Sequence, residues 1–172
     1  MELQTARLRM RPFTPADLDD LYPLYADPEV MHYIGVRNRD ETNVALAAMV
    51  DHWGEHGFGI WALMEAETGR FVGRCGLRRA AEVPDVELAY TLHKEFWGKG
   101  LATEASRAAL RFGFETIGID RIIAFAVPDN RGSTRVMDKL GMRYEKRAPF
   151  HQLDHMWYAI SRAEYTASCP TT

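Results

Sequence analysis

Hydrophobic and polar residues alternate in several short stretches of the chain, and this period of two predicts strands with one buried face. The stretch VELAYTLH at 86–93 shows the alternation clearly. The stretch RIIAFAV at 121–127 is instead apolar throughout, as expected of a strand that is covered on both faces. With the turn signals between them, these patterns predict strands at 8–13, 58–65, 71–78, 86–93, 121–127, 142–146 and 155–161.

Helical spacing appears between these strands. Leu101, Ala105, Ala108 and Phe112 are placed to form one apolar stripe on a helix that reaches about residue 117. Capping residues and glycines predict the other helices, which we place after Thr14, from Asp27 as a short second helix, at 41–53 before Gly54 and Gly57, and at 133–140. The order of elements indicates a mixed α/β fold built around the strand, turn, helix and strand at 86–127.

Length and composition indicate one globular domain. The 172 residues are 47% hydrophobic and 26% charged, and a chain of this size folds without disulfides or metals. Cys75 and Cys169 are the two cysteines, and Cys169 lies in a polar terminal stretch, so no structural disulfide is expected. We predict a single domain at 1–166 followed by a short polar tail at 167–172.

Net charge and the N-terminal sequence limit the kinds of partner that we expect. The net charge of −3 argues against a protein that binds nucleic acid through many phosphate contacts. The start MELQTARLRMRPF carries charges where a secretion signal needs an apolar core, and no apolar run is long enough to cross a bilayer. We therefore expect a cytoplasmic monomer or homodimer with no nucleic-acid or membrane partner.

The stretch EFWGKGLATEASRAALRFGF at 95–114 contains the most informative local pattern. Gly98 and Gly100 permit a turn without the steric cost of a Cβ atom, and the first N–H groups of the following helix have no partner inside it. These groups and the helix dipole favour an anion such as a phosphate or pyrophosphate. A turn that only joins a strand to a helix explains the glycines equally well. The spacing matches neither the Walker P-loop nor the G-x-G-x-x-G dinucleotide motif.

Three phrases in this order resemble the GCN5-related N-acetyltransferases (GNAT), and in particular the RimJ/RimL-type branch of ribosomal-protein alanine N-acetyltransferases. They are TARLRMRP at 5–12, VELAY at 86–90 with WGKGLATEA at 97–105, and NRGS at 130–133 with KLGM at 139–142. The resemblance covers about residues 5 to 161. It implies a single-domain GNAT fold with a central mixed, mostly antiparallel sheet, in which one parallel strand pair splays apart, flanked by helices.

The resemblance also implies acetyl-CoA as cosubstrate, with its pyrophosphate at the glycine turn and its pantetheine arm alongside the end of the central strand. The implied cofactor-binding residues are Tyr90, Thr91, Leu92, His93, Trp97, Gly98, Lys99, Gly100, Leu101, Ala102, Thr103, Asn130 and Ser133. Residues 97–103 would act through main-chain N–H groups. Asn130 would hold its loop or the pantetheine, and Ser133 would lie near the thioester.

The implied reaction is the direct transfer of an acetyl group to a primary amine in a ternary complex. The amine must lose a proton, the thioester oxygen must be stabilised as it gains charge, and the leaving thiolate must be protonated. The resemblance makes Glu87 the candidate general base, acting directly or through water, with Asp85 as the fallback.

The general acid is less clearly marked. Many members of the family have a tyrosine four residues after the position of Ser133, and this chain has Met137 there. Ser133 is therefore the candidate acid, although it is equally suited to bind pantetheine or to cap a helix. Tyr90 and Tyr144 are weaker candidates.

The acceptor side is the least determined. His32 and Tyr33 are the residues that we place in the acceptor pocket, which the early helices of this family form. The pairs His52–His56 and His151–His155 have the spacing of zinc ligands on a helix, but neither has a matching carboxylate motif, so we predict no metal.

Several functions remain open from the sequence. The acceptor amine is a protein N-terminus, an amino acid, a polyamine or an antibiotic. Because Met137 replaces the usual acid, a noncatalytic acyl-CoA-binding or sensing module is the alternative. A different phosphate ligand, such as a nucleotide, is a third reading of the turn.

Overall fold

A computed structural model describes residues 1–79, 83–150 and 152–168. The elements in chain order are β1 (Leu3–Gln4), β2 (Leu8–Pro12), a 3-10 turn (Pro15–Asp17), α1 (Leu18–Ala26), α2 (Arg39–His56), β3 (Ile60–Glu65), β4 (Phe71–Arg79), β5 (Val86–Leu92), a 3-10 turn (Lys94–Phe96), α3 (Leu101–Arg111), a π-helical turn (Phe112–Ile117), β6 (Arg121–Ala126), α4 (Arg131–Lys139), β7 (Arg143–Phe150), β8 (Leu153–Ser161) and α5 (Arg162–Ser168). His151 and Cys169 lie outside the described residues. Part of the expected loop at 80–84 and part of the expected tail at 167–172 also lie outside them.

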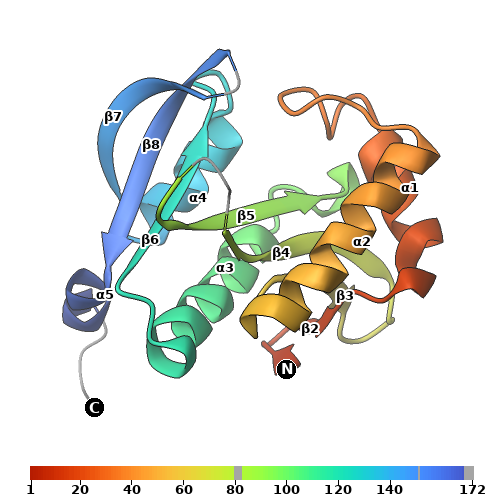
Figure 1. The fold of residues 1–172 in the computed structure, drawn as a ribbon, viewed down its shortest axis with the longest axis horizontal. Helices are drawn as coiled ribbons and strands as arrows, with labels where there is room; N and C mark the ends of the chain where they lie inside the picture. The colour runs from red at the N-terminus through yellow and green to blue at the C-terminus, as the bar shows by residue number, and fades with distance from the viewer. Residues whose placement is uncertain (80–82, 151, 169–172) are drawn as a thin grey trace.

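One mixed sheet of eight strands forms the centre of the molecule, in the order β1-β2-β3-β4-β5-β6-β8-β7. β5 and β6 run parallel, and the other described neighbours run antiparallel. Figure 1 shows α2 crossing the sheet on one side and α3 on the other. Leu46 of α2 packs in one buried cluster with Ala62 of β3, and Ala109 of α3 packs in another with Leu77 of β4. The expected mixed α/β fold is confirmed.

β5 and β6 separate after two residue pairs. Val86 pairs with Ile122 and Glu87 with Ile123, whereas the rest of β5 pairs only with β4 in the part of the chain that the structure describes. In Figure 1 the two strands diverge from this point. The divergence leaves one edge of β5 without a strand partner up to Leu92, as the family resemblance implies.

The prediction of a short helix from Asp27 is wrong. Residues 28–34 form turns. The Asp27 carboxylate accepts hydrogen bonds from the N–H groups of Glu29 (2.8 Å) and Val30 (3.3 Å). Such side-chain bonds offer the backbone an alternative to the helical pattern, so a residue that resembles a helix cap instead starts a loop.

α2 begins earlier and ends later than predicted. The Asn38 side chain accepts a bond from the Glu41 N–H (2.9 Å), and the Glu41 carboxylate accepts one from the Asn38 N–H (2.8 Å), which forms a capping box. Gly57 ends the helix with a φ of 71°. Gly54 lies inside α2, since a single glycine costs a helix only about 1 kcal/mol relative to alanine.

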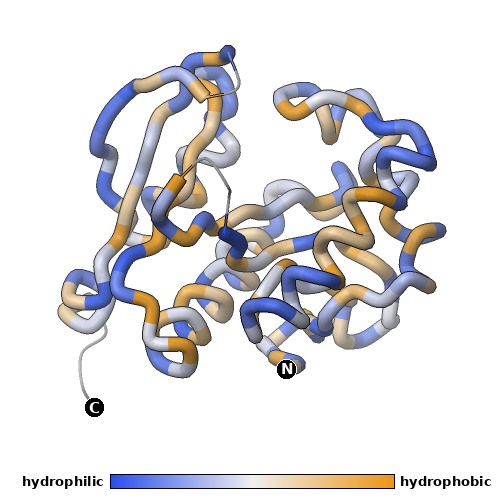
Figure 2. Tube along the Cα trace, in the orientation of Figure 1, coloured by the Kyte–Doolittle hydropathy of each residue, from blue (hydrophilic) through white to orange (hydrophobic). Residues whose placement is uncertain are grey.

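The closing strands are also longer than predicted. β7 is one of the two edge strands of the sheet, and most of its residues are exposed. Figure 2 shows it as largely hydrophilic. Charged residues on an edge strand oppose pairing with other chains, but they also remove the apolar alternation on which the sequence prediction depends.

The C-terminal helix α5 was not predicted from the sequence. None of the helices in the described ranges is both long and apolar enough to span a membrane.

His52 joins α2 to the sheet through both nitrogens of its ring. Nε2 accepts a hydrogen bond from the Arg79 N–H (2.9 Å), so Nδ1 carries the proton and donates to the Phe58 carbonyl oxygen (2.8 Å). This arrangement requires the neutral ring. Burial lowers the pKa of His52, which favours the same form.

We predict that His52 makes the fold sensitive to mild acid. Because its pKa is lowered in the folded state, its contribution to stability is present above the unfolded-state pKa of about 6.5 and is lost as the pH falls below that value. In urea unfolding between about pH 7.5 and pH 5, the free energy of unfolding of His52→Gln should fall less than that of the wild type. The exposed His32→Gln should follow the wild type, and equal pH slopes for all three proteins would contradict the assignment.

Candidate functional site

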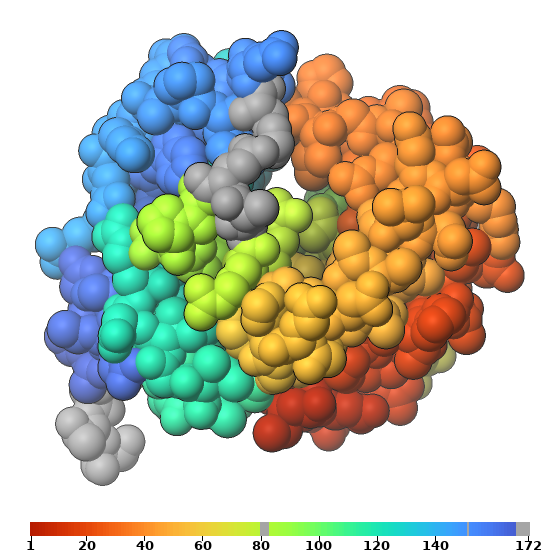
Figure 3. All heavy atoms as spheres, viewed as in Figure 1, coloured from red at the N-terminus to blue at the C-terminus, as the bar shows by residue number. Residues whose placement is uncertain are grey.

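A cleft of about 640 Å³ lies where β5 separates from β6. The loop after α1, the end of β5, the glycine turn before α3, and the loop before α4 with α4 itself form its wall. The space-filling view shows the surface hollowed between the β7–β8 hairpin and the loop after α1 (Figure 3). The separation of two strands thus brings segments that are distant in sequence to one site.

The glycine turn presents unpaired main-chain donors to this cleft. Gly98 and Gly100 have φ angles of 72° and 78°, the left-handed region that favours glycine. The Glu104 N–H donates to the Gly100 carbonyl oxygen, which is the first bond of α3. Among the described residues, the N–H groups of 98–103 have no hydrogen-bond partner. The Trp97 N–H donates to the Lys94 carbonyl oxygen (3.0 Å), so Trp97 offers no free donor, in contrast to the sequence prediction.

Residues of the N-terminal phrase brace this turn. The Glu104 carboxylate accepts hydrogen bonds from the Thr5 hydroxyl (2.6 Å), the Arg7 N–H (2.9 Å) and Arg7 Nε (2.7 Å). Arg7 also donates to the Lys99 carbonyl oxygen (2.9 Å). Although partial burial opposes it, these bonds hold the pKa of Glu104 below its ordinary value. Sequence reasoning did not assign Thr5, Arg7 or Glu104 a role.

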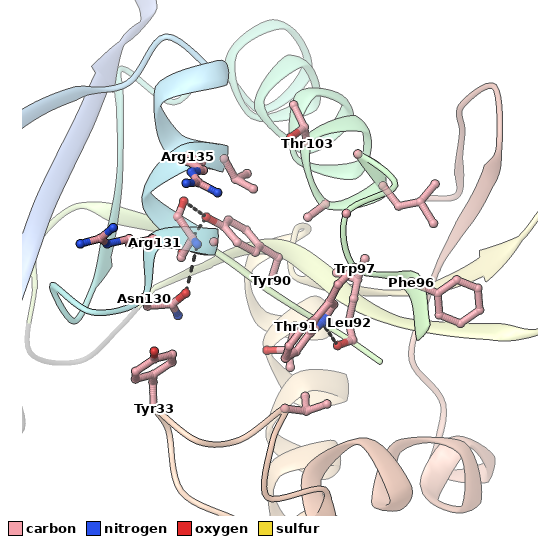
Figure 4. A pocket seen from close by; sticks show the side chains of 18 of the residues that line it. Tyr33, Tyr90, Thr91, Leu92, Phe96, Trp97, Thr103, Asn130, Arg131 and Arg135 are labelled. Carbon is pink, nitrogen blue, oxygen red and sulfur yellow. Dashed lines mark hydrogen bonds between the residues drawn. The ribbon is translucent and has the colours of Figure 1, made fainter. Parts of the chain in front are cut away.

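Tyr90, Ser133 and Asn130 form one hydrogen-bonded group in the cleft (Figure 4). The Tyr90 hydroxyl lies 2.8 Å from Ser133 Oγ and 3.0 Å from the Ser133 carbonyl oxygen. Asn130 caps α4 by accepting a bond from the Ser133 N–H (3.1 Å). Burial raises the pKa of Tyr90, so its phenol stays protonated.

Trp97 covers the end of β5. Its indole Nε1 donates to the Leu92 carbonyl oxygen (2.8 Å), and Figure 4 shows the ring beside Leu92. The Leu92 carbonyl is therefore occupied in this structure. The main-chain groups before Leu92 do not share this contact and are available to a molecule that extends β5 along its open edge.

Two of the predicted cofactor residues do not line the cleft. The His93 ring packs against Phe71, with 5.9 Å between ring centroids. The Lys99 ammonium lies 5.4 Å from the centre of the Phe96 ring. We leave the side chains of His93 and Lys99 out of the proposed site.

Tyr33 bridges two walls of the cleft. Its hydroxyl donates to the Asp129 carbonyl oxygen (3.2 Å), which links the loop after α1 to the loop before α4. Figure 4 shows the ring beside Asn130. His32 packs on the ring of Tyr33, 4.7 Å between centroids, and does not line the cleft.

α4 presents a basic face that sequence reasoning missed. Arg131, Arg135 and Lys139 are exposed, line the cleft, and have no ion pair among the described residues. Their spacing of four residues places them on one side of a helix and was the available signal.

Glu87 lies on the sheet face opposite to Tyr90 and does not line the cleft. Its side chain is 6% exposed, and both carboxylate oxygens accept bonds from Arg78, at 2.8 Å from Nε and 3.2 Å from Nη2. Asp85, the fallback base, pairs with Arg121 at 3.2 Å. Each candidate base is therefore held by an arginine.

Cys75 and Met137 belong to the core. Burial raises the pKa of the Cys75 thiol to about 12, so the residue carries no reactive thiolate at neutral pH. Met137 is 1% exposed, which shows that its position on α4 faces the core. Neither side chain lines the cleft.

Comparisons with known proteins agree with this geometry. The family model for the acetyltransferase (GNAT) domain matches residues 7–143. The protein YnaD of Bacillus subtilis, described as an uncharacterized N-acetyltransferase, is 31% identical over 173 residues, which cover 96% of this chain and 99% of YnaD.

Solved structures give the same result. An acetyltransferase from Agrobacterium tumefaciens is similar with a TM-score of 0.85 and 26% identity, over 93% of this chain and 94% of that one. The ribosomal-protein-S5-alanine acetyltransferase of Vibrio fischeri is similar with a TM-score of 0.80 over 96% and 98% of the two chains, but its 16% identity shows the fold alone. The family match over 7–143 and the relatives together show that this chain belongs to the GNAT family and is an N-acetyltransferase.

Proposed function

We propose that this protein transfers the acetyl group of acetyl-CoA directly to a primary amine while both molecules are bound at the cleft. The observation that carries the proposal is the run of unpaired N–H groups at 98–103, which opens onto the same cleft as the free edge of β5. GNAT enzymes use acetyl-CoA, which supplies an activated acetyl thioester when bound.

The residues present suit each part of acetyl-CoA. The N–H groups of 98–103, at the positive end of the α3 dipole, suit its pyrophosphate. Arg131, Arg135 and Lys139 add positive charge on the facing helix for phosphate oxygens. The main-chain groups of β5 before Leu92 suit the amides of the pantetheine arm.

The hydroxyl pair of Tyr90 and Ser133 is the proposed source of the proton for the leaving thiolate. Tyr90 stays protonated because it is buried, and Ser133 lies within hydrogen-bond distance of it. The pair offers a proton donor in place of the tyrosine that many family members have at the position of Met137. Its presence favours an enzyme over a noncatalytic binding module. Glu87 is the proposed base and acts through water, because its carboxylate does not line the cleft.

Catalysis itself is tested with acetyl-CoA and a panel of amines. We expect free thiol to appear only when an amine is present, together with one equivalent of acetylated amine by mass spectrometry. Cys75→Ala should turn over like the wild type, since the thiol is buried and protonated. Binding of CoA without thiol release from any amine would instead support a sensing module, and acetylated protein formed without amine would contradict direct transfer.

The glycine turn is tested by matched substitutions of Gly98, whose Cβ position is open space. Asn and Asp tolerate its left-handed φ similarly and differ in charge. We expect Gly98→Asp to reduce the increase in melting temperature caused by CoA far more than Gly98→Asn does, because the carboxylate repels the pyrophosphate. Turnover of S-acetyl-pantetheine, which lacks that group, should differ little between the two variants. Equal CoA shifts for both would remove the turn from the phosphate site.

The base is tested by a pair of variants at the Arg78–Glu87 contact. Glu87→Gln should lower kcat by roughly 10²- to 10⁴-fold, with CoA binding unchanged in a thermal-shift titration. Arg78→Gln keeps the carboxylate and should retain most of the activity. Equal losses for both variants would assign Glu87 a structural role, and full activity of Glu87→Gln at neutral pH would exclude it from the mechanism.

A further inference from the structure

Two buried polar side chains lie opposite each other on β4 and β5. Arg74 is the register partner of Thr91, and their relative exposures are 9% and 7%. Within the described residues, Arg74 Nε and Thr91 Oγ1 are both enclosed and have no hydrogen-bond partner. Side chains that face each other across neighbouring strands are in contact range. They therefore form one polar spot with unused hydrogen-bonding capacity, which is unfavourable unless a ligand or solvent satisfies it.

This spot lies on the side of β5 away from the proposed proton donor. Successive side chains of a strand point to opposite faces, so Thr91 points away from Tyr90, and Figure 4 shows this arrangement. Thr91 lines the cleft, and the Arg74 guanidinium carbon lies 5.4 Å from the centre of the Tyr25 ring of α1. The acetyl donor and the polar spot thus occupy opposite faces of the same strand end, which leaves the α1 side for the acceptor.

The charge around the spot is positive. Arg37, Arg78 and Glu87 are charged residues that interact electrostatically with Arg74. Glu87 is paired with Arg78 through both oxygens, so it does not neutralise Arg74. Arg37 stands over the same Tyr25 ring, 5.0 Å from its centre. Two guanidinium groups therefore share one aromatic ring without a carboxylate partner among the described residues.

We propose that the acceptor is a small amine that carries a carboxylate, as an amino acid does, and that Arg74 and Thr91 bind this carboxylate. The proposal rests on the acetyl transfer proposed above and names the substrate class of that site. A guanidinium donates parallel hydrogen bonds to a carboxylate, and a threonine hydroxyl donates one more. A polyamine would instead bring a second cation next to Arg37 and Arg74, where it would be repelled.

The carboxylate takes no part in bond making. A bond forms between the amine nitrogen and the acetyl carbon, and the carbon–sulfur bond of the thioester breaks. The amine loses one proton to the base, and the thiolate gains one from the Tyr90–Ser133 pair. Arg74 and Thr91 are therefore positioning residues that fix the acceptor from its anionic end.

The test compares related amines that differ in whether they carry a carboxylate. The panel contains amino acids, the corresponding amides, the decarboxylated amines, spermidine and a short peptide with a free N-terminus, and thiol release is the readout. We expect the best amino acid to exceed its amide in kcat/KM by roughly 10- to 100-fold, as is typical for loss of a charged hydrogen bond. Equal or better turnover of the amide, of spermidine or of a peptide N-terminus would overturn the substrate class while leaving acetyl transfer intact.

Arg74 is tested separately by variants of matched length. Arg74→Met should abolish the preference for the acid over its amide by raising KM for the acid, and Arg74→Lys should restore part of it. The exposed Arg9→Met on β2 is the control and should keep the wild-type preference. An unchanged acid-to-amide ratio in Arg74→Met would overturn the assignment.

A measurement on the wild type covers the case in which Arg74→Met does not fold. With CoA present, the N-acetylated amino acid should raise the melting temperature and its amide should not. Equal shifts would overturn the carboxylate site. No thiol release from any amine in the panel would instead overturn the proposed acetyl transfer, so the two failures are distinguishable.

Discussion

The separation of β5 from β6 after two residue pairs is the constraint on which the site depends. A strand inside a sheet normally has its main-chain groups paired on both sides, and here one side of β5 ends in a cleft. Because β6 then pairs with β8, the sheet divides into two parts that diverge like the arms of a V (Figure 1). The residues proposed to contact the donor lie at the end of β5, in the turn before α3, at the start of α3 or on α4, where this division opens.

The turn before α3 needs support that its own residues do not provide. Its glycines adopt left-handed conformations, and the N–H groups of 98–103 have no partner among the residues that the structure describes. Glu104 and Arg7 supply that support, because the carboxylate is fixed from three directions and the guanidinium reaches the Lys99 carbonyl. Residues before β2 therefore contribute to the proposed phosphate site without lining the cleft.

The alternation of side chains along β5 separates two kinds of chemistry. Tyr90 points toward α4, where its hydroxyl meets that of Ser133. Thr91 and Glu87 lie on the opposite face of the sheet, each across from an arginine of β4. A strand end that is open on one edge can thus hold a donor on one face and meet an acceptor on the other. The positive charge that remains on the second face is the property that separates acids from polyamines in our proposal.

The sequence by itself determined most of the order of strands and helices and the position of the glycine turn before α3, because periodicity, glycine positions and helix starts are local properties. The family followed from the resemblance of three phrases, which the comparisons then confirmed. It failed where local signals compete or vanish: Asp27 makes turn bonds in place of a helix cap, and the exposed strand β7 has little apolar alternation. Only the tertiary structure decided that Glu87 is held by Arg78, that Tyr90 meets Ser133 and that Arg74 lies unpaired beneath Tyr25. These relations join residues from different elements, and their distances are set by packing across the sheet, which no single stretch of sequence contains.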